Sequence, residues 1–235
     1  MGRSRTAVTA GSHQAATGSP APSALDHAPV FSGRQNADTM VIACGALARE
    51  IVHFRDLHTV PAFDVACIPA WIHNAPQLIP ERVREKIRHY RASYKRVLVA
   101  FADCGTGGLL DKVLGEEGVE RIDGPHCYAF YSGQTTFKDL AEEETGTLYL
   151  TDYMVRHFDK LIIEGLGLDR FPHLRDDYFG NYKRCLYIAQ TEDQGLQAKA
   201  RAAAEQLDLD YAYRFVGYGE LETFLAAAAT QPGAS

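Results

Sequence analysis

Cysteine and histidine residues recur at the ends of four successive apolar runs in this sequence. Cys44 ends the first run, His73 follows the second, Cys104 ends the third, and His126 with Cys127 follows the fourth. Thiolate and imidazole are typical ligands of tetrahedral zinc, and a catalytic zinc keeps three protein ligands and an open fourth position. The pattern predicts a metal site of Cys44, Cys104 and Cys127, with His126 or His73 as the fourth ligand or as an orienting residue.

Other roles for these residues stay open. The cysteines could be small apolar residues of a packed core. A cysteine nucleophile is a further alternative, in which Cys127 pairs with His73 better than with adjacent His126, because neighbours on an extended segment face opposite ways. Asp103 is a candidate base or orienting group, or the cap of the glycine turn that follows it. We predict catalytic roles for Asp103 and His73.

Glycines surround two of the cysteines, and they suggest a cofactor site. The stretch "CGTGG" at 104–108 fits neither GxGxxG nor GxxxxGK[ST], so it is no nucleotide signature. Successive backbone N–H groups at the start of a helix can still bind an anionic group. Gly45, Gly105, Thr106 and Gly107 are therefore the predicted cofactor-binding residues.

Three further features are expected to serve packing alone. Cys67 and Cys185 lie in the middle of apolar runs, as core residues do. Glu50 and His53 form an isolated ExxH, whereas a carboxylate-bridged di-iron site needs two such motifs and two more Glu. The sequence holds no second ExxH, so we expect this pair to serve the surface or helix packing.

The elements that must position these residues alternate between strand and helix. Hydrophobic periodicity predicts strands at 40–45, 63–71, 96–104 and 119–124, separated by helices at 46–58, 79–94 and 107–118. A strand or extended entry leading into a helix is expected at 146–163, then strands at 182–190 and 211–219 and helices at 191–209 and 220–230. This order predicts a three-layer, Rossmann-like α/β fold with a parallel sheet and helices on both faces, in one or two lobes. Ligands of such sheets bind beyond the carboxyl ends of the strands.

Composition restricts the class of protein. The chain has 235 residues, is 46% hydrophobic and carries a formal net charge of −6 without a dense Lys/Arg block, so nucleic acid is not an expected partner. No apolar stretch approaches the roughly 20 residues of a membrane helix. The five cysteines are scattered and odd in number, which indicates reduced thiols in a cytoplasmic protein.

Three segments divide the chain by composition. Residues 1–38 are rich in Ala, Ser, Gly and Pro and are predicted to be a disordered tail. The range 39–230 is predicted to be the single α/β domain. Residues 231–235 are expected to form a short flexible C-terminus.

Five separated segments together resemble a known family. "MVIACGALARE", "IPAWIHNAPQLIPERVREKI", "VLVAFADCGTGG", "RIDGPHCYAFYSG" and "GTLYLTDYMVRHFD" occur in that order. They are similar to the bacterial and archaeal domain-of-unknown-function family 1638 (DUF1638), over about 40–220. The resemblance implies that Cys44, His73, Cys104, His126 and Cys127 are positions shared with the family.

The resemblance also implies a metabolic setting. Genes of the family often lie near those of corrinoid-dependent methylamine or betaine methyltransferases, which implies one-carbon or corrinoid metabolism. The chain lacks the DxHxxG motif of corrinoid carriers, so a corrinoid would belong to a partner protein. The expected function is a metal-thiolate, zinc-dependent enzyme or accessory factor that acts on a small molecule or methyl group. The alternatives are an iron–sulfur or other metal-cofactor module without turnover, and a metal-free cysteine-dependent transferase or hydrolase.

Overall fold

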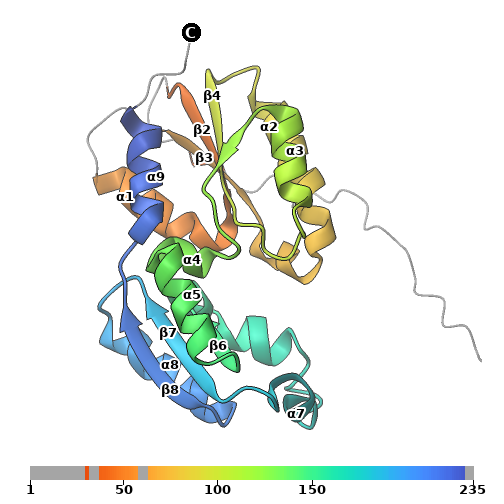
Figure 1. The fold of residues 1–235 in the computed structure, drawn as a ribbon, viewed down its shortest axis with the longest axis vertical. Helices are drawn as coiled ribbons and strands as arrows, with labels where there is room; N and C mark the ends of the chain where they lie inside the picture. The colour runs from red at the N-terminus through yellow and green to blue at the C-terminus, as the bar shows by residue number, and fades with distance from the viewer. Residues whose placement is uncertain (1–29, 32–36, 58–62, 231–235) are drawn as a thin grey trace, which may run out of the picture.

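The computed structural model describes residues 30–31, 37–57 and 63–230, and its strands form two sheets (Figure 1). The larger sheet has the order β1-β3-β2-β4-β5 and the smaller sheet the order β6-β7-β8. The strands of the larger sheet are β1 (Val30–Phe31), β2 (Thr39–Cys44), β3 (Asp64–Ile68), β4 (Arg96–Ala100) and β5 (Glu120–Arg121). Those of the smaller sheet are β6 (Thr147–Leu150), β7 (Arg184–Ala189) and β8 (Asp210–Phe215).

Helices connect the strands in both sheets. The α-helices are α1 (Ala48–Leu57), α2 (Ile79–Tyr90), α3 (Leu109–Glu117), α4 (Cys127–Ser132), α5 (Gln134–Glu143), α6 (Asp152–Arg156), α7 (Leu174–Phe179), α8 (Gln194–Gln206) and α9 (Gly219–Thr230). Short 3-10 helices are η2 (Gly45–Leu47), η3 (Ala70–Asn74) and η4 (Pro76–Leu78), and η5 (Asp159–Glu164) is a π-helix.

Strand β2 lies at the centre of the larger sheet and is fully buried. It pairs in parallel with β3 on one side and with β4 on the other, and β4 pairs in parallel with β5. The chain therefore runs from β2 to β3 on one side and then crosses back over β2 to β4 on the other side. The connections that follow β2 and β4 lead away from each other, so the switch point lies between these two strands. In open α/β sheets the crevice at such a switch point is where ligands bind.

The helices of the larger sheet form two groups. Helix α2 packs with α3, and α1 packs with α9 (Figure 1). Right-handed crossovers on the two sides of β2 place these groups on opposite faces. The apolar residues of α2 follow helical spacing and are buried, among them Val83, Ile87 and Tyr90. The expected three layers are therefore present.

The smaller sheet has a core of its own. Helix α8 packs on β7 and β8 and also contacts α6. Buried residues of this core include Leu150, Tyr187 and Ala200. Leu186 and Ile188 of β7 belong instead to the core of the larger sheet, so the two cores meet at β7. After β8 the chain returns as α9 to the larger sheet (Figure 1). The molecule thus has two lobes of the predicted Rossmann-like α/β class.

The sequence prediction of the elements differs from the structure at several points. The strands predicted at 63–71 and 96–104 end at Ile68 and Ala100, because the chain turns into η3 and into a glycine loop. Helices α4, α5 and α7 were not predicted, and Cys127 begins a helix instead of lying in an extended segment. These helices are short, and periodicity is weak over six to ten residues.

The predicted tail 1–38 lies largely outside the described residues, as does the predicted C-terminus 231–235. Within that tail, Val30–Phe31 form β1 and pair antiparallel with β3, so these two residues belong to the sheet. The domain start predicted at 39 coincides with the first residue of β2. Among the described residues no helix is long and apolar enough to cross a membrane.

Candidate functional site

The carboxyl end of β2 and helix η3 bring Cys44 and His73 together. The Sγ of Cys44 lies 4.0 Å from the Nε2 of His73. The other ring nitrogen of His73 is 2.8 Å from the carbonyl oxygen of Ala70, to which Nδ1–H donates. The His73 ring is stacked on Phe101, with ring centroids 5.6 Å apart. A donating Nδ1 leaves the lone pair of Nε2 directed at the thiol.

Backbone hydrogen bonds join the segments that carry Cys104 and Cys127. The N–H of Asp103 donates to the carbonyl of Gly124 at 3.1 Å, and the N–H of Cys104 donates to that of Pro125 at 2.9 Å. Cys104 has a φ of 49°, which is uncommon for a residue with a Cβ. The hydrogen bonds hold this strained residue beside the start of α4, where Cys127 lies.

The three thiols lie close enough to influence one another. Burial raises the pKa of Cys44 well above its ordinary value, and Cys127 and Cys104 raise it further. Burial and the neighbouring Cys104 likewise raise the pKa of Cys127. Burial and Asp103 raise the pKa of Cys104 to about 11. All three are therefore protonated thiols at neutral pH unless a cation offsets their desolvation.

His126 is exposed and precedes α4 in an extended conformation. Partial desolvation of the imidazole and the nearby His73 lower the pKa of His126, against the opposing effect of Asp103. His126 is therefore neutral at pH 7 and has a lone pair for a ligand. The Cys44 contact, however, is made by His73, so the proposed pairing of His73 with Cys127 is replaced by a pairing with Cys44.

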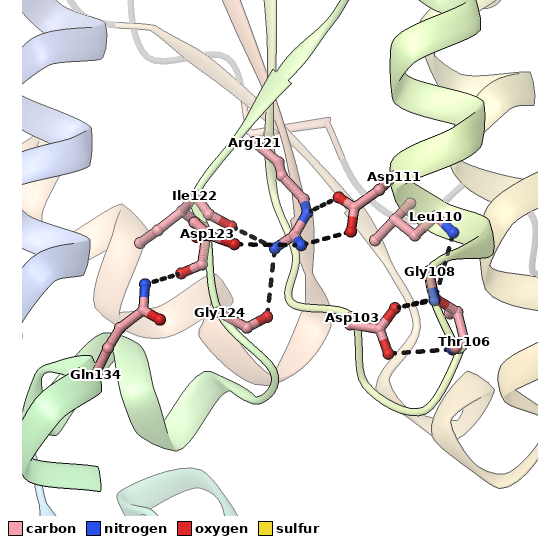
Figure 2. Close-up of polar contacts among 11 residues, drawn as sticks. Asp103, Thr106, Gly108, Leu110, Asp111, Arg121, Ile122, Asp123, Gly124 and Gln134 are labelled. Carbon is pink, nitrogen blue, oxygen red and sulfur yellow. Dashed lines mark hydrogen bonds and ion pairs between the residues drawn. The ribbon is translucent and has the colours of Figure 1, made fainter. Parts of the chain in front are cut away.

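Asp103 caps the glycine turn (Figure 2). Its carboxylate accepts from the Thr106 hydroxyl at 2.5 Å and from the N–H groups of Gly108 and Gly107 at 2.9 and 3.2 Å. Burial raises the pKa of Asp103, but these hydrogen bonds outweigh it and hold the pKa below its ordinary value. An ionised carboxylate with three donors is a weak base, so the capping role is the one that the geometry supports.

The predicted cofactor-binding glycines have structural roles. The Thr106 hydroxyl and the Gly107 N–H are used by Asp103, so the loop already holds an anion of its own. Gly105 and Gly107 have φ values of 85° and 64°, where a side chain would be strained. A Cβ on Gly45 would lie 3.1 Å from the carbonyl oxygen of Ile68, so glycine lets η2 pack against the end of β3.

Arg121 fastens the loop after β5 to helix α3. Its guanidinium contacts both carboxylate oxygens of Asp111, at 2.6 and 3.0 Å. It also donates to the carbonyls of Ile122 and Gly124 (Figure 2). Because Gly124 in turn accepts from Asp103, this arginine braces the backbone on which Cys104 and Cys127 are held.

The smaller sheet contributes a buried carboxylate that the sequence prediction missed. Asp152 follows β6 and is fully buried. It accepts hydrogen bonds from the Tyr187 hydroxyl at 2.6 Å, the Gln190 N–H at 2.9 Å and the Thr191 hydroxyl at 2.5 Å. The Nη2 of Arg156 lies 3.5 Å from the same carboxylate. Thr151 as N-cap of α6, followed by Asp152, is a sequence signal that could have located this element.

Glu50 joins the two lobes, contrary to the surface role considered for it. It lies in α1 and is 4% exposed, whereas His53 is exposed. The Oε1 of Glu50 is 3.9 Å from the Nη1 of Arg156 in α6. A cavity of about 420 Å³ adjoins this pair and is also lined by Gly45, Tyr153 and His157. Both lobes therefore supply residues to a cavity at the end of β2.

The predicted metal ligands are thus brought to one region but are not assembled into a compact group. Within the described part of the chain, no three His, Cys, Asp or Glu side chains are arranged so that they could hold a metal ion. Cys44 and His73 are in contact, and Cys104 and Cys127 are their neighbours. Cys67 and Cys185 are buried in the two cores, as expected for packing residues.

Comparison with known proteins gives one match. The model of a family described as "Protein of unknown function (DUF1638)" matches residues 67–225. No curated protein and no solved structure matches the chain. The matched range includes His73, Cys104, His126 and Cys127, whereas Cys44 and Glu50 precede it.

Proposed function

The chain belongs to the DUF1638 family, and from that premise we propose that it is a metal-thiolate protein, with zinc as the metal. Cys44, Cys104 and Cys127 would supply the thiolates, with His73 as the imidazole ligand and His126 as the alternative. The proposed site lies where the connections of the larger sheet diverge, which is the ligand position of this fold.

The contact between Cys44 and His73 is the observation that carries the proposal. Two ligands of a tetrahedral zinc lie about 3.5 Å apart, since Zn–S is about 2.3 Å and Zn–N about 2.0 Å. The observed separation of Sγ and Nε2 is 4.0 Å. Metal-ligating histidines usually donate their other ring N–H to a carbonyl or carboxylate, as Nδ1–H of His73 does to Ala70. This pair would therefore supply one thiolate and one imidazole to the proposed zinc.

The electrostatics of the thiols favour a metal over a metal-free nucleophile. Burial keeps Cys44 and Cys127 protonated, and their mutual proximity adds to the cost of a thiolate. Without a metal, His73 would have to accept the proton from the Cys44 thiol, whose ionisation is unfavourable. A bound zinc would supply the positive charge that holds a thiolate at neutral pH, which is the state that accepts an alkyl group.

We further propose that the site serves an enzyme or accessory factor in one-carbon metabolism. A small-molecule substrate would approach the thiolates from the cavity between the lobes. The methyl-transfer part of the proposal and a corrinoid protein or methyltransferase as partner rest on the resemblance to the family. Within the chain, the Cys44 thiolate would accept the methyl group, and His73 would fix the orientation of that thiolate. Tyr153 would help to exclude water.

Metal analysis of anaerobically purified protein tests this proposal. We expect close to one zinc per chain, and large losses in C44S, C104S and C127S variants. Cys185→Ser is the control for C44S, because Cys185 is likewise a buried thiol but lies in the other core. Iron with sulfide and a brown colour would instead indicate an iron–sulfur module. Absence of metal under reducing, zinc-replete conditions, with rapid alkylation of Cys44, would indicate the metal-free nucleophile.

A further inference from the structure

Two polar atoms at the cavity between the lobes have no hydrogen-bond partner among the residues that the structure describes. They are the Oε2 of Glu50 and the Nη1 of Arg156, and both are buried. The 3.9 Å between Glu50 Oε1 and Arg156 Nη1 is too long for a hydrogen bond. An unpaired buried donor or acceptor costs about 1–3 kcal/mol. The structure therefore presents an unused acceptor and an unused donor beside one cavity.

The neighbouring carboxylate of Asp152 pairs with the other terminal nitrogen of Arg156, Nη2, at 3.5 Å, and leaves Nη1 without a partner among the described residues. Asp152 already accepts three hydrogen bonds, from Tyr187, Gln190 and Thr191. Arg49, beside Glu50 on α1, and His157, beside Arg156, complete the polar lining. The cavity of about 420 Å³ has room for a small organic molecule.

The cavity also borders the residue that follows the proposed reactive thiol. Gly45, which follows Cys44, is part of its lining, and so is Tyr153. A molecule held by Glu50 and Arg156 would therefore lie beside the residue that follows Cys44.

We propose that this cavity binds a small amino carboxylate, with the carboxylate on Arg156 and the ammonium group on Glu50. Each charged end of such a zwitterion satisfies one of the two unpartnered atoms. An arginine presents donors in the planar geometry that a carboxylate accepts. The inference rests on the proposed function only in taking Cys44 as the reactive end of the cavity.

Calorimetric titration with glycine, glycolate and acetate tests the assignment. The three acids share a carboxylate and differ in the group on the adjacent carbon. We expect glycine to bind the wild-type protein at least about tenfold more tightly than glycolate or acetate. This is the effect expected from one buried charge-assisted hydrogen bond, here between the ammonium group and Glu50. Equal affinities, tighter binding of glycolate, or no binding of glycine to the folded protein would overturn the proposal.

Variants separate the two ends of the ligand. Arg156→Gln should abolish glycine binding, and Glu50→Gln should remove the preference for glycine over acetate. Arg175→Gln is the matched control: it removes an arginine that is paired with Asp208 in the same lobe as Arg156. This variant should bind glycine as the wild-type protein does. Because the interlobe variants could unfold the chain, Ala48→Leu provides a second test: it leaves both charges in place and puts a larger side chain into the cavity. Retained binding in A48L or R156Q would overturn the proposal.

Repeating the titrations with zinc-loaded and chelator-treated protein distinguishes the two proposals. Glycine binding without zinc retention would leave the amino carboxylate site intact and overturn the metal site. Zinc retention without glycine binding would do the reverse.

Discussion

The Nε2 of His73 faces the thiol of Cys44 at 4.0 Å while its Nδ1–H is held by the carbonyl of Ala70. This relationship fixes one tautomer of the imidazole and points its lone pair at a single sulfur. His126, which lies one residue from Cys127 in the sequence, has no such contact with Cys44 among the described residues. The two histidines therefore have different expected effects.

We predict that His73→Ala lowers bound zinc severalfold, whereas His126→Ala has a smaller effect. The reason is that only His73 is oriented by a backbone carbonyl toward a cysteine. Zinc content after gel filtration in the presence of a weak chelator measures the difference. A larger loss in H126A would show that His126 is the imidazole ligand.

Alkylation of Cys104 in metal-free protein should be slow at neutral pH and rise only in strongly alkaline solution. Burial, and then Asp103, raise the pKa of Cys104 to about 11, so the thiolate fraction at pH 8 is about a hundredfold below that of a free thiol with the usual pKa. Mass spectrometry of iodoacetamide-treated protein follows this rate by residue. Urea-unfolded protein provides the reference, and equal rates in the folded and unfolded chain would contradict the expectation.

Replacing Asp103 with Ala should lower the free energy of unfolding by about 1–3 kcal/mol, because three donors of the loop lose their acceptor. The pKa of Asp103 is lower in the folded chain than its ordinary value. Its stabilising effect is therefore complete above the unfolded-state pKa, about 3.9, and is lost as the pH falls through the folded-state pKa. Urea unfolding of wild type and D103A at pH 7 and in acid measures both effects. A difference between the two proteins that grows on acidification would be inconsistent with this sign.

Arg156→Met should destabilise the chain by about 1–3 kcal/mol, because Glu50 loses the cation that bridges the lobes. The pKa of Glu50 is raised, chiefly by burial, and Arg156 opposes that rise. In R156M the carboxyl of Glu50 should therefore take up a proton more readily. Combining R156M with Glu50→Leu should recover part of the loss, which a double-mutant cycle in urea would detect. Strictly additive effects would mean that the two residues act independently.

Cys67→Ala and Cys185→Ala should each cost about 1 kcal/mol of stability and leave bound zinc unchanged. Both thiols are buried in strands, at 5% and 0% exposure, so the loss is one of packing. Thermal unfolding and metal analysis of the same preparations check the two parts. Loss of zinc in either variant would place that cysteine in the site.

The sequence predicts well what depends on the parallel sheet. Strand order and alternation bring Cys44 and Cys104 to the same edge, whichever helices cover the faces. Which histidine contacts Cys44, His73 or His126, depends instead on how η3 turns after Pro69. Hydrophobic periodicity does not predict that turn.

Residues whose role depends on distant partners could not be predicted in this way. In the sequence Glu50 is one half of an isolated ExxH. The burial of Glu50 is explained by Arg156, which packs against it from the other lobe. The role of Asp103 was left open between base and cap, because a carboxylate before a glycine turn suits both. The N–H groups that choose between them become visible only in three dimensions.

Helix α9 gives the chain an order of assembly. Leu221, Leu225 and Ala228 of this last helix belong to the core of the larger sheet, although the whole smaller lobe separates them from it in sequence. Gly219 meets α4 so closely that a Cβ there would collide with the carbonyl of Tyr131. During synthesis, the face of the first sheet beside α1 therefore stays uncovered until the second lobe has emerged. A nascent or truncated chain without α9 would expose this apolar face. A ribosome-bound chaperone would therefore have more time to bind this face than the rest of the chain.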